Sequence, residues 1–187
     1  MMRLRLIEAP AALPVTLTDV KAHTRFESDH EDSVLLGQIA SAVDLLDGPT
    51  GILGRAILTQ VWRLELATWP GSMVIPIEPV QSVAITYLGA QGATETVSPG
   101  QYYLSGSPGQ ASSLHWSTGW VPPALMADAD FPVLIDITAG FGGPEATPPA
   151  ISQAIMMMVA HWHQNREGQG QIPATASALL SRYRRFL

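Results

Sequence analysis

Two histidines near the end of a predicted helix, His161 and His163, are the closest pair of histidines in the chain. On a helix with about 3.6 residues per turn, two positions correspond to a rotation of about 200°. The two imidazoles would therefore point in nearly opposite directions and cannot bind one metal ion together. We interpret them as one partly buried and one exposed histidine.

An acidic run offers the next candidate for chemistry. Glu27, Asp29, Glu31 and Asp32 lie close together and could attract a hard cation. A helix–loop–helix calcium loop needs glycine at its sixth position and glutamate at its twelfth. Counted from Glu27, these positions hold Asp32 and Gln38. The run is better explained as acids placed favourably at the N-terminus of a helix.

The run Gly140-Phe141-Gly142-Gly143 follows a predicted strand and precedes a predicted helix, which is the order found in dinucleotide-binding loops. The third glycine of that fingerprint is replaced by Glu145. Pro148 and Pro149 then separate the glycines from the helix, so its N-terminal amides could not hold a phosphate there. We interpret the run as the exit from a strand.

Other catalytic signatures are missing from the sequence. It contains no Gly-x-Ser-x-Gly, no Walker loop and no His-Glu-x-x-His. With no cysteine, the chain has no disulfide, thiolate metal site or cysteine nucleophile. We therefore assign no catalytic, cofactor-binding or metal-binding residue and expect no cofactor. Acidic catalytic residues dispersed along the sequence stay open as an alternative.

The composition predicts one domain, or one domain with a large insertion. The chain has 187 residues, of which 47% are hydrophobic and 14% charged, so it can bury a good core and still leave apolar surface for partners. No run of about eighteen apolar residues predicts a membrane span. The first residues meet Glu8 and Pro10 too early for a signal peptide, so we expect none.

The net charge of −6 is unevenly distributed. Residues 1–55 carry five basic and eight acidic groups, residues 56–140 carry one and six, and residues 141–187 carry four and two. Only the last segment is basic. We expect the body to repel nucleic acid and the C-terminal segment to attract an acidic partner surface.

Residues 1–55 carry helix signals and are expected to form an N-terminal helical segment. Residues Thr16 to Asp19 resemble a capping box that opens a short helix ending at about Phe26. A second helix begins between Asp29 and Asp32 and ends at Gly48-Pro49. Its apolar stripe consists of Leu35, Ile39, Ala42 and Leu46.

From about Ala56 the apolar pattern has a period of two, which predicts a half-buried strand up to Leu66. Further short strands are predicted at 73–77, 82–88, 94–97, 101–105, 112–116 and 132–138. Most breaks between them hold Gly, Pro or Ser. Residues 56–140 are therefore expected to form a small antiparallel sheet inserted between helical segments.

The segment 141–187 predicts two helices, 149–166 and about 174–184. The first has an apolar stripe of Ile151, Ile155, Val159 and Trp162. Met156-Met157-Met158 fits either the core or a subunit interface. The predicted fold class is α+β: a bundle-like part of two N-terminal and two C-terminal helices with the inserted sheet, together one structural unit.

The end of the chain combines three arginines with three large hydrophobic residues. A solvated helix end, where the helix dipole favours cations, is one interpretation, and contact with nucleic acid is another. Docking on a protein fits best, because arginine and aromatic residues are enriched at interface hot spots. The docking residues would be Arg182, Tyr183, Arg184, Arg185, Phe186 and Leu187.

Several blocks, in order, resemble a known family. They are Pro14 to His23; the acidic stretch to Asp32 with the helix into Gly48-Pro49-Thr50-Gly51; Trp69-Pro70 with Ile75-Pro76 and Pro79 to Val83; Ala139-Gly140-Phe141 with Pro149, Ala160-His161-Trp162 and Asn165-Arg166-Glu167; and Pro173 with Leu179-Leu180 and Tyr183-Arg184. On these blocks the chain resembles the head–tail connector (adaptor) proteins of long-tailed bacteriophages, prophages and gene transfer agents. One departure is residues 47–55, which are longer than the family's usual Thr-Gly-Arg turn.

The resemblance implies a structural ring, usually of twelve copies, in the neck of a phage or phage-like particle assembled in the bacterial cytoplasm. Its partners would be further copies of itself, the portal protein above and a tail-side neck protein (a stopper or tail terminator) below. Double-stranded DNA would pass through without specific binding, and no membrane would be involved. The terminal residues 182–187 would dock on the portal.

A ring needs two different patches on each subunit, because head-to-tail contacts close by rotation. The predicted helices at 31–47 and 149–166 are the candidates for these patches. The expected ring contacts are Leu35, Ile39, Val43, Met157, His161 and Arg166. The alternative function is a monomeric module that binds a ligand or peptide with its central sheet.

Overall fold

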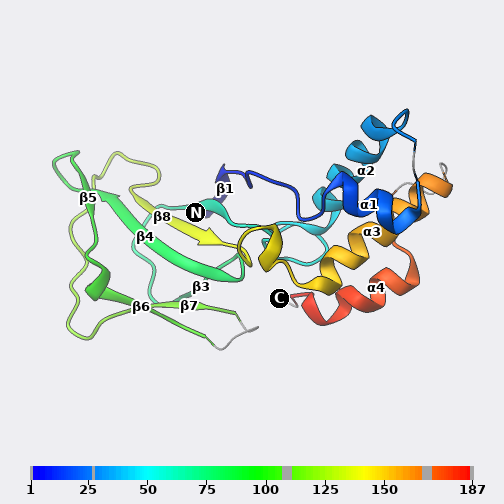
Figure 1. Cartoon of the computed structure of the whole chain (residues 1–187). Coiled ribbons are helices and arrows are strands. Elements are labelled where there is room, and N and C mark those ends of the chain that lie inside the picture. The colour runs from blue at the N-terminus through cyan, green and yellow to red at the C-terminus, as the bar shows by residue number, and fades with distance from the viewer. Residues whose placement is uncertain (1, 27, 107–110, 166–169, 186–187) are drawn as a thin grey trace. The chain divides into compact units, whose positions relative to one another are not determined.

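The computed structural model describes residues 2–26, 28–106, 111–165 and 170–185. The chain forms two compact units, each built from two stretches of sequence (Figure 1). The sheet unit comprises Met1–Ala9 and Thr59–Gly140, and the helical unit comprises Pro10–Leu58 and Phe141–Leu187. The predicted α+β class is confirmed, with four α-helices and two antiparallel sheets among the described residues.

The larger sheet has five strands in the order β1-β2-β8-β4-β5, and every neighbouring pair is antiparallel. The strands are β1 (Met2–Glu8), β2 (Gln60–Leu66), β8 (Val133–Ala139), β4 (Val80–Leu88) and β5 (Thr94–Thr96). Four of them were predicted within a few residues. The edge strand β1 was not, although Arg3 to Leu6 alternate between charged and apolar residues.

One face of this sheet is apolar. The register places Leu4 beside Leu64, Leu64 beside Ile135 and Ile135 beside Ile85, so these side chains form a row across four strands. Leu64, Ile85 and Ile135 are fully buried. The period-two pattern of β2 is therefore confirmed, because successive side chains of a strand point to opposite faces.

The opposite face of the sheet is held by ion pairs. Arg63 on β2 donates two hydrogen bonds of 2.7 Å to the carboxylate of Asp136 on β8. Glu65 on β2 pairs with Arg3 and, at 2.6 Å, with Arg5 on β1, and the side chain of Glu65 is only 4% exposed. The polar face of β2 is only partly covered: Glu65 is buried beneath the arginines of β1, while Val61 and Arg63 stay partly exposed, in keeping with the half-buried strand that the sequence predicted.

The remaining strands form a second sheet in the order β3-β7-β6, where one sheet was expected. They are β3 (Met73–Val74), β7 (Ser113–Trp116) and β6 (Tyr102–Ser105), and a short 3₁₀ turn, Pro99–Gln101, leads into β6. The hydroxyl of Tyr102 donates to the carbonyl of Val83 on β4 at 2.8 Å, which ties the two sheets together. An aromatic cluster adds to this contact: Trp69, Tyr87, Trp116 and Trp120.

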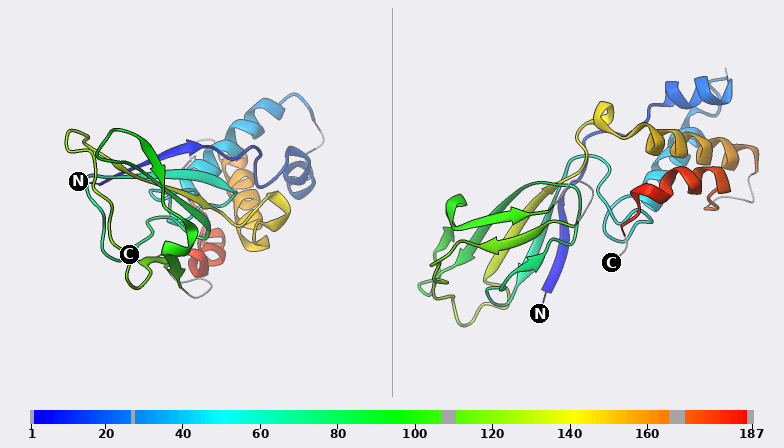
Figure 2. Two further views of the ribbon diagram at one scale, coloured as in Figure 1. Left: turned by 90° about the vertical axis from the view of Figure 1, so that its left-hand side faces the viewer. Right: turned by 90° about the horizontal axis from the view of Figure 1, so that it is seen from below.

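The helical unit contains α1 (Leu17–Thr24), α2 (Asp32–Leu46), α3 (Pro149–Gln164) and α4 (Ala174–Leu180), with 3₁₀ turns at Pro144–Ala146 and Ser181–Tyr183 (Figures 1 and 2). The predicted capping box is confirmed: Thr16 accepts from the Asp19 backbone, and the Asp19 carboxylate accepts from the Thr16 backbone. None of the described helices is both long and apolar enough to cross a membrane.

The core of the helical unit is built from the stripes that the sequence predicted. Both α2 and α4 pack on α3, which lies between them in Figure 1. Every residue of the two stripes is at most 2% exposed: Leu35, Ile39, Ala42 and Leu46 on α2, and Ile151, Ile155, Val159 and Trp162 on α3. Of the three consecutive methionines, Met158 is fully buried, while Met156 and Met157 pack against the core from its edge.

Candidate assembly interface

The C-terminal segment is attached to its own helical unit. The side chain of Arg55, which is 8% exposed, donates from Nε to the carbonyl of Tyr183 at 2.8 Å. The backbone N–H of Arg185 donates to the carbonyl of Leu53 at 2.9 Å. The ring of Tyr183 also meets Phe141 edge to face. The segment before the last two residues is therefore part of the folded unit.

The loop that receives this segment coincides with the departure noted in the sequence. Asp47 and Gly48 each form an isolated β-bridge with Arg55, and Asp47 accepts a hydrogen bond from the Ile57 backbone at 2.6 Å. Gly51 packs so closely on the end of α2 that a Cβ there would overlap the carbonyl of Asp47. The added loop length thus forms the surface on which residues 183–185 are hydrogen-bonded, a contact that the sequence did not predict.

The predicted portal-docking residues differ in exposure. Arg182 is exposed, and its guanidinium lies 5.2 Å from the centre of the Tyr183 ring. Tyr183, Arg184 and Arg185 are each partly buried. Phe186 and Leu187 lie outside the described residues. Among the described ones, Arg182 therefore offers the most accessible charge to a partner.

The predicted ring contacts are also divided by the structure. Leu35 and Ile39 are fully buried in the helical core, so neither side chain has surface to offer a neighbouring subunit. Val43, Met157 and His161 are partly exposed, and Arg166 lies outside the described residues. The physical reason is that a stripe of large apolar residues on a helix faces the core of its own domain first. We therefore remove Leu35 and Ile39 from the candidate interface.

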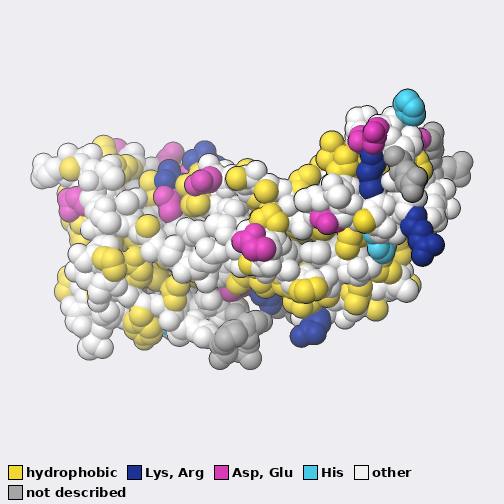
Figure 3. All heavy atoms as spheres, viewed as in Figure 1, with side chains coloured by type: hydrophobic (Ala, Val, Ile, Leu, Met, Phe, Trp, Pro, Cys, Tyr) yellow, Lys and Arg dark blue, Asp and Glu magenta, His cyan; other side chains and the backbone are white. Residues whose placement is uncertain are grey.

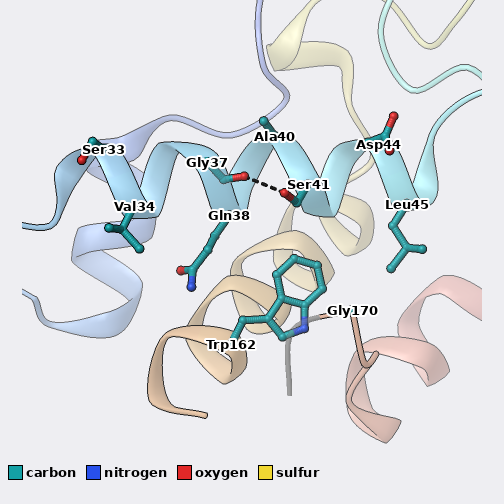
Figure 4. A pocket seen from close by; sticks show the side chains of 10 residues that line it. All are labelled: Ser33, Val34, Gly37, Gln38, Ala40, Ser41, Asp44, Leu45, Trp162 and Gly170. Atoms are coloured by element: carbon teal, nitrogen blue, oxygen red, sulfur yellow. Dashed lines mark hydrogen bonds between the residues drawn. The ribbon is translucent and has the colours of Figure 1, made fainter. Parts of the chain in front are cut away.

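The outward side of α2 is the better candidate surface. Val34, which borders this side, is 48% exposed; Leu36, about 200° further around the helix, is 43% exposed on another side. These two are the exposed large hydrophobic side chains of the helical unit among the described residues. A hollow of about 800 Å³ is bordered by this side of α2, Trp162 of α3 and Gly170. Figure 4 shows the side chains that line it. We call it the α2 groove. Sequence reasoning missed it because many of its α2 residues are small or polar and lie beside the buried stripe, not in it.

A glutamine lies at the base of the α2 groove. Gln38 is 5% exposed, and its Oε1 has no hydrogen-bond partner in the part of the chain that the structure describes. Trp162, opposite, donates its indole N–H to the carbonyl of Gln171 at 2.7 Å, which fixes the groove wall. A buried amide without a partner is costly, so a partner that reaches Gln38 would be stabilised there.

The described part of the acidic run and one of the two histidines, His163, make contacts within the helical unit. Lys21 of α1 lies 2.6 Å from Asp29 and 2.6 Å from Asp32. The hydrogen bond from Lys21 lowers the pKa of Asp29, and the same contact raises the pKa of Lys21. His163 lies 3.1 Å from Glu31, and its ring meets Phe26 edge to face. Among the described residues, no group of three or more His, Asp or Glu side chains could hold a metal ion.

Hydrophobic side chains reach the surface over both units in the space-filling view, including over α4 (Figure 3). With an accessible apolar helix face and an arginine-bearing C-terminal segment, the described surface has the features of a protein that associates with other proteins. The geometry therefore points to a class of proteins that act by assembly.

Comparison with known proteins identifies assemblies of this kind. Over 99% of this chain and 97% of the other, the structure resembles a chain from the neck of an empty gene transfer agent particle with C6 symmetry, with a TM-score of 0.77 and 24% identity. A chain of the native gene transfer agent virion gives a TM-score of 0.76 and 25% identity over 98% and 97% of the two chains. A chain of the native particle's neck with C12 symmetry gives 0.70 and 25% over 99% and 97%.

No protein-family model matches the chain, and no curated protein does. The structural likeness nevertheless extends over nearly the whole length of the chain and of its neighbours. The resemblance to neck proteins of phage-like particles that the sequence predicted is thereby confirmed.

Proposed function

We propose that this chain is a structural, non-catalytic component of the neck of a phage-like particle, where it forms a ring between the portal and the tail. The observation that carries the proposal is the likeness over 98% of the chain to a chain of the gene transfer agent virion. A likeness that extends over both the sheet unit and the helical unit supports a common role better than a likeness limited to one of them would.

Repeated copies around an axis support the ring. One similar chain comes from a neck with C6 symmetry and another from a neck with C12 symmetry. Twelve copies of this chain, related head to tail, would each use two different patches. A tail-side neck protein would cover the other surface of the ring.

The charge distribution supports passage of DNA without binding. Residues 56–140, which include most of the sheet unit, carry one basic and six acidic groups. An acidic lining repels phosphates, so a duplex would slide through the ring without being held. This proposal expects weak interaction with double-stranded DNA that does not weaken further as salt is added, because salt screens the repulsion.

The C-terminus would make the portal contact. Residues Tyr183 to Arg185 are anchored on the helical unit through Arg55 and Leu53, and this anchor would present the residues that follow to the portal. Deleting Phe186 and Leu187 should abolish attachment to a purified portal while leaving ring formation unchanged. Unchanged portal attachment would remove this part of the proposal.

The direct test is to locate the protein in purified particles. We would attach a small tag at the N-terminus, purify the particles and image them by electron microscopy, and expect the extra density as a ring at the neck. Deleting the gene should give filled or empty heads separated from tails. A chain absent from the particles and strictly monomeric at every concentration would instead favour the alternative, a module that binds a ligand or peptide with its sheet.

A further inference from the structure

The outward side of α2 is unusually poor in charge for a helix facing water. From Ser33 to Leu46 the one charged residue is Asp44, which is exposed and has no ion-pair partner among the described residues. Val34 and Leu36 are exposed on the same helix. A helix with two exposed large hydrophobic side chains and one charge over fourteen residues suits a surface that is covered by another protein.

The α2 groove fits another helix. Ser33, Gly37 and Ser41 follow at intervals of four, so they form a row of small side chains along the groove. Such a row allows the axes of two helices to approach closely. Gln38 is buried beside this row, and its Oε1 has no hydrogen-bond partner among the described residues, so it becomes an acceptor for the incoming helix once its side chain turns into the groove (Figure 4).

The exposed face of α4 and its 3₁₀ extension has the complementary features. Thr175, Ala178 and Arg182 are exposed, and their spacing places them on one side of this segment. The first two are small enough to enter a narrow groove, and Thr175 carries a hydroxyl donor. Arg182 carries the positive charge that could pair with Asp44 of another copy. Because α2 and α4 both pack on α3, with α3 between them, a copy can offer one surface to each of two neighbours.

We propose that the α2 groove of one copy receives the exposed face of α4 from the next copy, with Arg182 paired to Asp44 and Gln38 accepting a hydrogen bond from the incoming helix. The contact joins two different patches, so it repeats head to tail and can close a ring. This inference rests on the proposed ring and specifies its interface. Under this inference Arg182 contacts the neighbouring subunit, and it is no longer assigned to the portal-docking surface.

Charge reversal tests the pair. Asp44→Arg alone and Arg182→Asp alone should each raise the protein concentration needed for ring formation by at least about tenfold, because like charges would then face each other. The double variant should return it to near the wild-type value. Asp128→Arg is the matched control, since it reverses an exposed aspartate in the sheet unit. Rings would be counted by mass photometry and by electron microscopy of purified particles.

Disulfide formation between introduced cysteines gives a second measurement. Because the chain has no cysteine of its own, any disulfide must join the introduced residues. We would mix the single variants Gly37→Cys and Ala178→Cys and oxidise them. Gly37 has open space around a new Cβ, so the variant should fold. A disulfide-linked dimer containing one copy of each variant is expected. A mixture of Gly71→Cys with Ala178→Cys is the control, because Gly71 also has room for a side chain but lies in the sheet unit.

The outcomes separate this inference from the function on which it rests. If wild-type rings form but neither charge reversal nor cysteine pairing shows the contact, the α2–α4 interface is overturned and the ring stands. If the wild-type chain forms no ring at any concentration and is absent from particle necks, both proposals fail. Restoration by the double reversal together with the mixed disulfide would establish the interface.

Discussion

Arg55 holds Tyr183 by a hydrogen bond of 2.8 Å from its Nε to the tyrosine carbonyl, although 128 positions separate the two residues. The bond joins the loop after α2 to the end of the chain. It also places a nearly buried guanidinium against a backbone acceptor. The chain is thus positioned as far as Arg185 before any partner arrives, which lowers the conformational entropy that this segment would lose on binding.

Replacing Arg55 should release the C-terminal segment. Arg55→Ala removes a charged donor from a buried site, so we expect a loss of about 1–3 kcal/mol in the free energy of unfolding. Limited proteolysis should then cut near residues 181–185 much faster than in the wild type. Arg182→Ala is the matched control, because this arginine is exposed, and its stability should change by less than about 0.5 kcal/mol. Equal protease resistance in both variants would contradict the anchoring role.

The ion pairs of Glu65 with Arg3 and Arg5 should make the stability of the fold depend on pH. Burial would raise the pKa of Glu65, but the hydrogen bond and charge of Arg3, followed by those of Arg5, outweigh it and hold the pKa below its ordinary value of 4.5. Because the folded-state pKa is the lower one, this stabilisation is present above pH 4.5 and is lost as the pH falls through the folded-state value.

The variant Glu65→Gln should isolate this effect. Near neutral pH it should unfold more easily than the wild type by about 1–3 kcal/mol, because a buried charged acceptor is lost. Below the folded-state pKa of Glu65 the two proteins should converge. Chemical denaturation at a series of pH values measures both. A difference that stays constant down to strong acid would show that Glu65 acts through packing and not through its charge.

Gly37 should separate folding from assembly. A side chain at this position meets nothing within 4 Å in the helical unit, and glycine costs a helix roughly 1 kcal/mol relative to good helix formers. Gly37→Leu should therefore keep or raise the melting temperature while filling the α2 groove and preventing ring formation. Gly37→Ala should stabilise the helix with a smaller effect on assembly. Rings that form normally with Gly37→Leu would argue against the groove as an interface.

The capping box of α1 should contribute measurably to stability. The Thr16 hydroxyl donates to the Asp19 carboxylate at 2.6 Å and accepts from the Asp19 backbone at 3.1 Å. Thr16→Ala should cost about 1 kcal/mol, the usual effect of removing an N-cap. Thr18→Ala is the control, because Thr18 lies two residues further along the chain and is exposed; it should change stability by less than about 0.5 kcal/mol. Thermal unfolding followed by circular dichroism measures both.

Much of the secondary structure could be predicted because it is encoded by local spacing. Thr16 and Asp19 are three residues apart, and the buried stripes of α2 and α3 follow the helical period. The strands after Ala56 were found by their period of two and by the turn residues between them. These signals depend only on residues a few positions apart, and over that range the helix or strand period fixes which side chains share a face.

The predicted interface residues stay a prediction, but the burial of two of them could not be foreseen, because burial depends on distant neighbours. Leu35 and Ile39 were expected on the ring surface, yet they face α3, which begins more than a hundred residues later. Whether an apolar helix position points to the core or to a partner cannot be read from its own period. The α2 groove was missed for the complementary reason, since Ser33, Gly37 and Ser41 repeat every four residues but are not hydrophobic, so their spacing gives no apolar pattern.

The sequence by itself determined the kinds and order of the helices and strands, the absence of cysteine chemistry and the basic end of an acidic chain, all properties of residues and their close spacing. Only the tertiary structure decided that Met2–Glu8 joins the sheet, that Arg3 covers Glu65 and that the C-terminus is attached beside Arg55. Each of these contacts links residues about sixty or more positions apart. Such pairs form because burial and charge pairing lower the free energy of the whole fold, and no local pattern specifies the partner.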